Sequence, residues 1–324
     1  RIVYLNGSFV PETEAKISVF DRGFLFADGV YEVTSVLGGK RVDFAGHAAR
    51  LERSLGELRM KMPCSQDELL AIHRELIARN ELAEGLIYLQ ITRGVQDRDF
   101  VFPAETVPQT LVLFPQSRPI VDNPLADRGA RIACVEDLRW GRRDIKTTQL
   151  LYSSLAKMIA RDKGADDAWL VEDGLVTEGS SNNAYIVTRE GTIVTRDLST
   201  RILAGITRAA VLSCARDLQM KIEERPFTVA EAQAAREAFT TSATGLVCPV
   251  VEIDGVEVGD GQPGPVARRL RQNYIDESLR SAAAGVRAAA SRSAASGPGG
   301  RLVGAQDGSP PAGFGIALER HTFP

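Results

Sequence analysis

Apolar and polar positions alternate in patterns that predict strands and helices from the first residues to about residue 280. Asn6-Gly7, between Val3-Tyr4 and Phe9-Val10, is a strong signal for a β-hairpin turn. Leucines at helical spacing predict a helix near residues 51–58. Further strands are predicted over Tyr31–Leu37, Arg41–Phe44, Leu86–Thr92, Thr110–Phe114, Ala168–Val171 and Ala184–Val187. Further helices are predicted over Gln66–Asn80, Leu150–Lys163, Ile206–Leu218 and Val266–Leu279.

The character of the chain changes at two places, which predicts its division into domains. The polar stretch Pro115–Gly129 contains further prolines and indicates a linker. Near residue 281 large apolar residues almost disappear, and Ala, Gly, Ser and Arg dominate, so the segment cannot bury enough surface to offset its ordering entropy. We expect a smaller N-terminal domain over residues 1–118, a linker over 119–129, a larger domain over 130–280 and a disordered tail over 281–324.

The composition is that of an ordinary soluble globular protein, with 324 residues, 44% hydrophobic and 25% charged. A net charge of −3 gives no support to nucleic acid as a partner, because phosphate binding needs a surplus of Lys and Arg. Apolar runs are strand-length, so we expect no membrane span. Cys64, Cys134, Cys214 and Cys248 lie far apart, which predicts neither a disulfide framework nor a zinc site. With no signal peptide expected before Arg1, we predict a cytoplasmic protein with reduced thiols.

The familiar single motifs of enzyme chemistry are absent from the sequence. It has no Walker A loop, no HExxH and no GxSxG elbow. Three histidines are present: His47 and His73 in predicted helices, and His321 in the predicted tail. We interpret each as a surface or capping residue, and we expect neither a histidine-based hydrolase nor a metal site.

Six spaced segments carry a more specific signal than any single motif. They are Asp21-Arg22-Gly23-Phe24, Asp28-Gly29-Val30-Tyr31-Glu32, Arg50-Leu51, Asp144-Ile145-Lys146-Thr147, Thr177-Glu178-Gly179-Ser180-Ser181-Asn182-Asn183 and Ile202-Leu203-Ala204-Gly205-Ile206-Thr207-Arg208. Their order and spacing resemble the class IV aminotransferases, a group that includes D-amino-acid, branched-chain and (R)-selective amine transaminases and aminodeoxychorismate lyase. The resemblance runs from about residue 2 to 280 and is closest to the D-amino-acid transaminases.

The resemblance implies a pyridoxal 5'-phosphate enzyme, and the chemistry of that cofactor accounts for the segments. Lys146 matches the lysine that forms a Schiff base with the cofactor, which requires an amine whose pKa is lowered enough to attack an aldehyde. Glu178 matches the carboxylate that keeps the ring nitrogen protonated. Gly205-Ile206-Thr207 opens a predicted helix, and a helix N-terminus binds a phosphate dianion through its free amides.

Other cofactor residues follow from the family pattern. Arg50 would add a bidentate charged contact to the phosphate. A third phosphate contact would come from the turn Ser242-Ala243-Thr244, in which Ala243 stands where the family often has Thr. Leu203 would pack against the face of the ring. The implied fold is α+β of the fold type IV kind: a smaller N-terminal α/β domain and a larger pseudo-barrel domain, with the cofactor between them.

The implied reaction is ping-pong transfer of an amino group from a D-amino acid to a 2-oxo acid such as 2-oxoglutarate or pyruvate. The resemblance also implies a homodimer, in which one N-terminal domain completes the pocket of the other subunit. In D-amino-acid transaminases a Tyr, an Arg and a His bind the substrate carboxylate, the last two from the partner. Tyr31 and Arg98 match this pattern, whereas Phe100 occupies the histidine position.

Three alternatives remain at this point. An (R)-selective amine transaminase shares the fold and the cofactor, but its glutamate loop usually has Glu-Gly-x-Gly-Phe-Asn where this chain has Glu178-Gly-Ser-Ser-Asn. Aminodeoxychorismate lyase would need a different loop after Glu178, and it would catalyse an elimination from its substrate rather than the transfer of an amino group. A cofactor-holding protein without turnover would need neither Lys146 nor Glu178.

Overall fold

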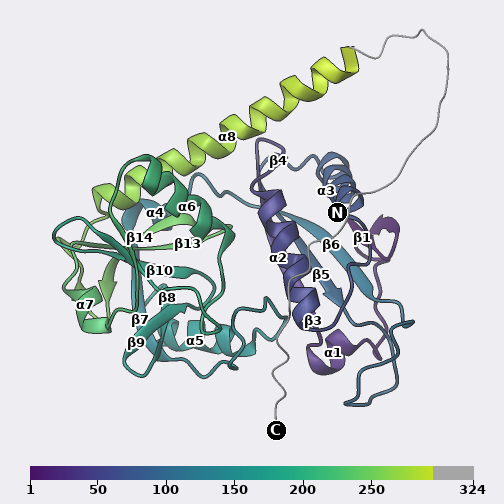
Figure 1. The fold of residues 1–324 in the computed structure, drawn as a ribbon, viewed down its shortest axis with the longest axis horizontal. Coiled ribbons are helices and arrows are strands. Elements are labelled where there is room, and N and C mark those ends of the chain that lie inside the picture. Colours follow the sequence, from purple (N-terminus) through teal and green to yellow (C-terminus); the bar gives the residue numbers. More distant parts are fainter. Residues whose placement is uncertain (295–324) are drawn as a thin grey trace, which may run out of the picture. The chain divides into compact units, whose positions relative to one another are not determined.

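The first sheet has six antiparallel strands in the order β2-β1-β6-β5-β3-β4 (Figure 1). The strands are β1 (Ile2–Leu5), β2 (Ser8–Pro11), β3 (Gly29–Leu37), β4 (Lys40–Arg41), β5 (Gly85–Thr92) and β6 (Thr110–Ser117). The predicted hairpin turn joins β1 to β2, and both of its residues have positive φ, Asn6 at 46° and Gly7 at 98°. The computed structural model describes the backbone of residues 1–294 and the side chains of residues 1–280.

Three helices accompany this sheet: α1 (Arg22–Phe26), α2 (Phe44–Glu57) and α3 (Gln66–Arg79). Helix α2 lies against β3 and buries Leu51 and Leu55, while α3 buries Leu69 and Leu76 in the same apolar core. Helix α3 begins with a capping box. The Ser65 side chain accepts a hydrogen bond from the amide of Glu68, and the Glu68 side chain accepts one from the amide of Ser65. The leucine spacing that predicts these helices is therefore the spacing of their buried faces.

The second sheet has nine strands, in the order β12-β11-β10-β13-β14-β7-β8-β9, with β15 paired to β14. These strands are β7 (Ala130–Glu136), β8 (Asp167–Glu172), β9 (Leu175–Gly179), β10 (Asn183–Val187), β11 (Ile193–Thr195), β12 (Ile222–Glu224), β13 (Glu237–Ser242), β14 (Leu246–Ile253) and β15 (Val256–Glu257). The accompanying helices are α4 (Pro124–Arg128), α5 (Leu151–Asp162), α6 (Ile206–Asp217), α7 (Val229–Gln233) and α8 (Pro265–Ala294). Three of its strand pairs are parallel and the others antiparallel, which confirms the predicted α+β class.

Apolar side chains cover both faces of the second sheet. Alternate residues of β10 point to opposite faces, so Tyr185 packs in one core and Ile186 in another. The ring of Tyr185 stacks on Phe239 of the neighbouring β13 with centroids 4.5 Å apart. This two-sided burial explains why β10 is apolar along nearly its whole length rather than at every second residue.

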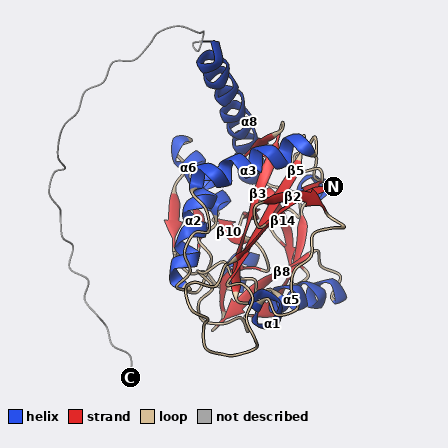
Figure 2. Ribbon diagram, turned by 90° about the vertical axis from the view of Figure 1, so that its right-hand side faces the viewer, coloured by secondary structure: helices blue, strands red, loops and turns tan. Residues whose placement is uncertain are grey.

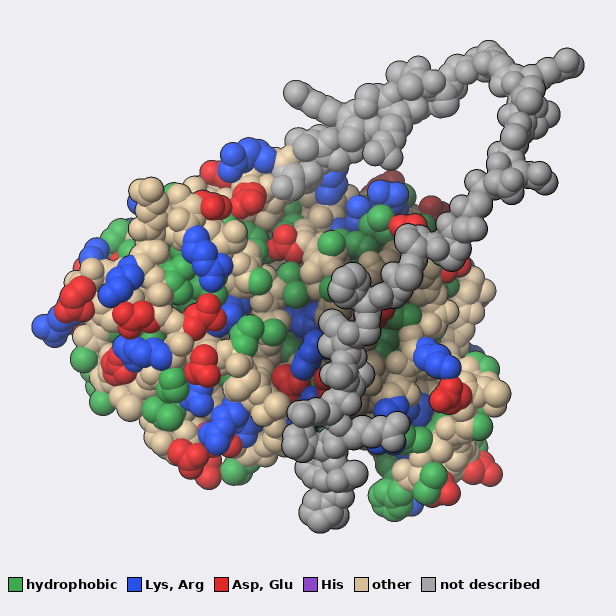
Figure 3. Space-filling view, viewed as in Figure 1, with side chains coloured by type: hydrophobic (Ala, Val, Ile, Leu, Met, Phe, Trp, Pro, Cys, Tyr) green, Lys and Arg blue, Asp and Glu red, His purple; other side chains and the backbone are tan. Residues whose placement is uncertain are grey.

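Both sheets lie within one compact unit, residues 1–285, and residues 286–324 form a second unit. The first sheet draws its strands only from residues before 118, and the second only from residues after 129. No helix of the described residues is long and apolar enough to cross a membrane. Lys and Arg side chains are interspersed with Asp and Glu on the face displayed in Figure 3.

Three details differ from the sequence predictions. The predicted linker contains α4, because Pro124 favours a first helical position and the Asn123 side chain accepts a hydrogen bond from the amide of Leu125. The segment after β4 turns into α2 at Phe44 instead of continuing as a strand. Helix α8 continues beyond residue 279 to 294, through a segment rich in alanine, the strongest helix former. The rest of the predicted tail, 295–324, lies outside the described residues.

The large apolar residues of α5 are exposed rather than buried. Leu151, Leu155 and Met158 are 85%, 51% and 50% exposed, and the helix packs on the sheet through Ala156 and Ala160. Helices α1 and α5 lie at the same end of the structure in both ribbon views (Figures 1 and 2). This end therefore presents apolar surface that the described residues do not cover.

Candidate active site

A cavity of about 670 Å³ lies where the two sheets meet, and most of the predicted site residues line it. The predicted residues in its wall are Tyr31, Arg50, Lys146, Glu178, Leu203, Ile206, Thr207, Ser242, Ala243 and Thr244. They come from β3, α2, the segment before α5, β9, the start of α6 and the turn after β13. The folded chain thus brings together residues that are spread over more than 200 positions of the sequence.

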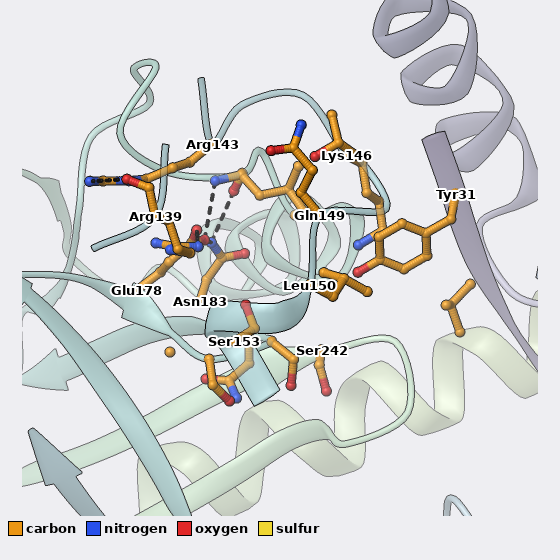
Figure 4. Close-up of a pocket in the computed structure, with 18 of the residues that line it drawn as sticks. Tyr31, Arg139, Arg143, Lys146, Gln149, Leu150, Ser153, Glu178, Asn183 and Ser242 are labelled. Atoms are coloured by element: carbon orange, nitrogen blue, oxygen red, sulfur yellow. Dashed lines mark hydrogen bonds and ion pairs between the residues drawn. The ribbon is translucent and has the colours of Figure 1, made fainter. Parts of the chain in front are cut away.

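Lys146 is held in the cavity by backbone pairing with β3. The amide of Tyr31 donates to the carbonyl of Lys146 over 3.0 Å, and Thr147 forms a bridge with Val30. Lys146 Nζ lies 4.2 Å from the centroid of the Tyr31 ring (Figure 4). The amine therefore stands in the cavity beside a phenol, in a position fixed by main-chain hydrogen bonds.

Glu178 is a buried carboxylate with a partner on each oxygen (Figure 4). Arg139 Nη1 donates to Oε1 over 2.7 Å, while Asn183 Nδ2 and the amide of Leu203 each donate to Oε2 over 3.1 Å. Burial raises the pKa of Glu178, and the charge and hydrogen bond of Arg139 oppose that rise. The site thus contains a carboxylate that protein donors help to keep ionised.

Arg139 is itself held by a second buried carboxylate. Its Nε and Nη2 donate to the two oxygens of Asp137 over 2.9 and 2.7 Å. Thr177 donates to Asp137 as well, and Arg143 lies 3.3 Å from it. Burial alone would raise the pKa of Asp137, but these donors lower it overall. The guanidinium of Arg139 is therefore locked between Asp137 and Glu178.

The start of α6 can bind an anion. Its N-cap residue is Gly205, so no side chain accepts from the first amides of the helix, and Ile206 and Thr207 face the cavity. A Cβ on Gly205 would lie 2.1 Å from Asn183 Oδ1, which explains the glycine at this position. The opposite wall is the turn of residues 242–244, whose Ala243 carbonyl accepts from Ser35 of β3.

Arg98 and Phe100, the other two predicted substrate residues, do not line this cavity. Both are exposed, Phe100 to 76%. The guanidinium of Arg98 lies 5.3 Å from the ring of Phe26 and 5.2 Å from that of Phe100. Within a single chain, therefore, only Tyr31 of the three stands at the site.

The two described histidines are buried, which corrects their interpretation as surface or capping residues. His47 Nδ1 lies 2.7 Å from Glu32 Oε2, and the side chain also lines the cavity. His73 bonds to the carbonyl of Leu69, and its burial lowers its pKa to about 4. His321 lies outside the described residues. The described residues contain no cluster of His, Cys, Asp and Glu that could hold a metal ion.

Several residues of the site were not identified from the sequence. Asn183 stands in one of the six segments that carry the family resemblance, and its amide type was the available signal. Arg139 and Asp137 stand in no motif, and the pairing of Arg139 with Glu178 spans 39 residues of chain. Glu32 stands in the segment Asp28-Gly29-Val30-Tyr31-Glu32, but the sequence alone indicates no role for it.

Comparison with known proteins places these features in a family context. Residues 29–253 match the family described as "Amino-transferase class IV". The D-alanine aminotransferase of Staphylococcus aureus (strain MSSA476) is 38% identical over 274 residues, which is 84% of this chain and 96% of that protein. The D-alanine aminotransferase of Bacillus licheniformis is 37% identical over 277 residues, with the same coverage of both chains.

Solved structures show the same fold. The T.th. branched-chain amino acid aminotransferase with pyridoxamine 5'-phosphate has a TM-score of 0.78 at 30% identity, covering 85% of this chain and 93% of its own. The branched-chain amino acid aminotransferase of Escherichia coli has a TM-score of 0.75 at 24% identity, covering 85% of this chain and 92% of its own.

Crowding at Gly205 predicts that Gly205→Ala is destabilising. The new methyl group would displace the Asn183 side chain, which donates a hydrogen bond to Glu178. We therefore expect the free energy of unfolding to fall by about 1–3 kcal/mol. Gly56→Ala is the matched control, because a Cβ there meets nothing within 4 Å and alanine favours the helix. Thermal unfolding measures both variants. Equal stability of Gly205→Ala and the wild type would contradict the described packing.

Proposed function

The chain belongs to the class IV aminotransferase family, and from that premise we propose that it transfers the amino group of a D-amino acid to a 2-oxo acid. The observation that carries this proposal is the single cavity that holds Lys146, Glu178 and the uncapped start of α6. The D-alanine aminotransferases quoted above, at 37–38% identity, support the choice of a D-amino acid as donor. The acceptor would be 2-oxoglutarate or pyruvate.

The enzyme uses pyridoxal 5'-phosphate, and the residues of the cavity fit this cofactor. The uncapped amides of α6, together with Arg50 and the 242–244 turn, would hold the phosphate. Glu178 would hold a proton on the ring nitrogen, and Leu203 would pack against the ring. When bound, the cofactor supplies an electron-withdrawing ring that stabilises negative charge on the carbon bearing the amino group.

Lys146 Nζ has two tasks in this proposal. It would hold the cofactor covalently in the resting enzyme, and as a free amine it would take up the proton that leaves the α-carbon of the donor and then release it. The backbone pairing with β3 keeps the amine on one side of the cavity. The phenol of Tyr31 flanks the amine and limits the space in which the donor can lie.

Replacing Lys146 should abolish covalent attachment of the cofactor. Wild-type protein should show visible absorbance from lysine-bound cofactor and should trap it on borohydride reduction, whereas Lys146→Ala should do neither. Lys61→Ala is the control, because Lys61 lies at the exposed surface and pairs only with Glu105 among the described residues. Mass spectrometry of the reduced protein identifies the modified residue. Covalent trapping at another lysine in Lys146→Ala would show the assignment to be wrong.

Replacing Glu178 should impair turnover far more than binding. Glu178→Gln keeps the shape of the side chain but removes the charge that would hold the proton on the ring nitrogen. We expect turnover to fall by orders of magnitude, while the affinity of the apoenzyme for the cofactor changes little. Single-turnover kinetics and a cofactor titration measure the two quantities. Near-normal turnover would mean that another group faces the ring nitrogen.

A homodimer would complete the substrate side of the site. Arg98 and Phe100 are exposed in the single chain, and other large apolar side chains are exposed near them in the sequence and on α1 and α5. These residues are Phe24, Val101, Leu151, Leu155 and Met158. A second copy of the chain that covered this surface would bring Arg98 of one subunit to Tyr31 of the other.

Cys64, Cys134, Cys214 and Cys248 are all free thiols, which supports the reducing cytoplasm as the compartment.

Phe100 favours a second activity at the same site. A histidine at this position would donate a hydrogen bond to the carboxylate of a D-amino acid, and its absence weakens carboxylate binding by roughly 1–2 kcal/mol. The phenyl ring also makes its surroundings more apolar. The proposal therefore includes relaxed selectivity, with slower turnover of apolar (R)-amines that have no carboxylate.

A panel of D-amino acids, L-amino acids and (R)-amines, followed through the colour change of the half-reaction, tests the proposed function. D-Amino acids should react fastest, and a preference for L-amino acids would overturn the proposal. In Arg98→Ala the value of kcat/KM for D-amino acids should fall by about a hundredfold, because a charge partner of the carboxylate is lost. Turnover of (R)-amines should stay unchanged. Equal effects on both donors, or none, would exclude a role of Arg98 in carboxylate binding.

Mixing an Arg98→Ala variant of low activity with an inactive Lys146→Ala variant tests whether Arg98 acts across subunits. The Arg98→Ala and Lys146→Ala proteins are mixed, dissociated and reassociated. A mixed dimer would contain one complete site, with Lys146 from one subunit and Arg98 from the other, so activity on D-amino acids should exceed the sum of the two proteins alone. No gain in a sample that contains mixed dimers would place Arg98 outside the partner's site.

A further inference from the structure

Three hydrogen bonds fix the guanidinium of Arg50. Its Nε and Nη2 donate to the two oxygens of Glu32 over 2.8 and 2.7 Å, and its Nη1 donates to the carbonyl of Ala204 over 2.9 Å. A guanidinium has five N–H groups, so one remains on Nη1 and one on Nη2. These two N–H groups, on neighbouring nitrogens, are free to form the fork that binds two oxygens of an anion.

Glu32 reaches Arg50 from outside the cavity. It belongs to β3, is 3% exposed and does not line the cavity, whereas Arg50 and His47 do. Burial alone would raise the pKa of Glu32, but the charge and hydrogen bond of Arg50, together with His47, lower it to about 2. Glu32 is therefore a permanent anion near neutral pH.

His47 binds the same carboxylate from one turn earlier in α2. Its Nδ1 lies 2.7 Å from Glu32 Oε2, and because an ionised carboxylate can only accept, Nδ1 carries the proton of this bond. His47 and Arg50 are three residues apart and thus project from the same side of the helix. Between them the two side chains leave Glu32 little freedom to rotate.

The carbonyl of Ala204 sets the direction of the fork. Ala204 stands two residues before Ile206, the first residue of α6, so the bond from Arg50 ties α2 to the start of that helix. A Cβ on Gly46 would lie 3.1 Å from Ile206, so the two helices also meet directly at this place. The free end of Arg50 is consequently held beside the uncapped amides of Ile206 and Thr207.

We propose that Glu32, itself held by His47, is a positioning residue that aims the free fork of Arg50 at the phosphate of the cofactor. The inference rests on the proposed role of Arg50 in phosphate binding. Glu32 touches neither cofactor nor substrate and acts only through the guanidinium. Its effect should be specific to the phosphate, because Arg50 is proposed to bind that group.

The test compares the affinity of the apoenzyme for pyridoxal 5'-phosphate with its affinity for pyridoxal, which lacks the phosphate. The ratio of the two affinities isolates the contribution of the phosphate from the stability of the fold. In Glu32→Gln the ratio should fall by about tenfold, the size expected for a lost hydrogen bond to a charged group. Binding of pyridoxal should stay unchanged.

Glu237→Gln is the matched control. Glu237 is also a buried carboxylate, 4% exposed, and it accepts from the amides of Val266 and Ala267 at the start of α8 instead of facing the cavity. Its replacement should lower stability without changing the ratio. Should Glu32→Gln fail to fold, His47→Gln gives the second measurement, because an amide still donates to Glu32 but constrains it less, so the ratio should fall by a smaller factor.

A double-mutant comparison with Arg50→Gln tests the role of Arg50 in phosphate binding and the positioning role of Glu32 separately. If wild-type protein binds the phosphorylated and unphosphorylated compounds equally well, or if Arg50→Gln keeps the wild-type ratio, the proposed role of Arg50 is wrong. If Arg50→Gln lowers the ratio but Glu32→Gln and His47→Gln do not, or if they weaken both compounds equally, the positioning role of Glu32 is overturned. The inference holds if Glu32→Gln lowers the ratio alone and has no further effect in the Arg50→Gln background.

Discussion

The edge of β3 is the constraint on which the site depends. Strand β4 pairs only with Val36 and Leu37, so most of the outer edge of β3 has no strand beside it within the first sheet. Backbone groups at such an edge need partners, and the residues that supply them here are 146–148. The same strand carries Tyr31, Glu32 and Ser35, which contact the lysine, the arginine and the 242–244 turn. A shift of β3 by one residue would therefore disturb every part of the cavity at once.

The charges of the site form two separate groups, each nearly balanced in itself. Glu178 and Asp137 share Arg139, with Arg143 beside them, whereas Glu32 shares its charge with Arg50 and His47. Buried charges are tolerated only when they are paired and hydrogen-bonded. The pairing leaves each functional group one open side toward the cavity. These hydrogen bonds thus orient the side chains before any ligand arrives, which reduces the reorganisation needed during the reaction.

The sequence identified much more of the site than of the network that supports it. Lys146, Glu178 and Thr207 stand in local motifs whose spacing reflects the start of a helix or the end of a strand, so their place in the cavity could be anticipated. Arg139, Asp137 and the pairing of His47 with Glu32 depend on contacts between elements distant in the sequence, which leave no periodic signal. The exposure of the apolar face of α5 could not be predicted either, because apolar residues recur at the same spacing whether a helix packs on the core or presents them at the surface. Helix α4 and the length of α8 depended on local caps and propensity, which set element boundaries only weakly.

The packing of α5 has a consequence for how the protein behaves on dilution. Two alanines bring this helix close to its sheet, while half or more of the surface of Leu151, Leu155 and Met158 stays exposed. These side chains would contribute more to stability if a second copy of the chain excluded water from them, and that contribution would obey mass action. Chain concentration would accordingly become a thermodynamic variable of folding, so that the melting temperature of the enzyme rises with the amount of protein in the sample.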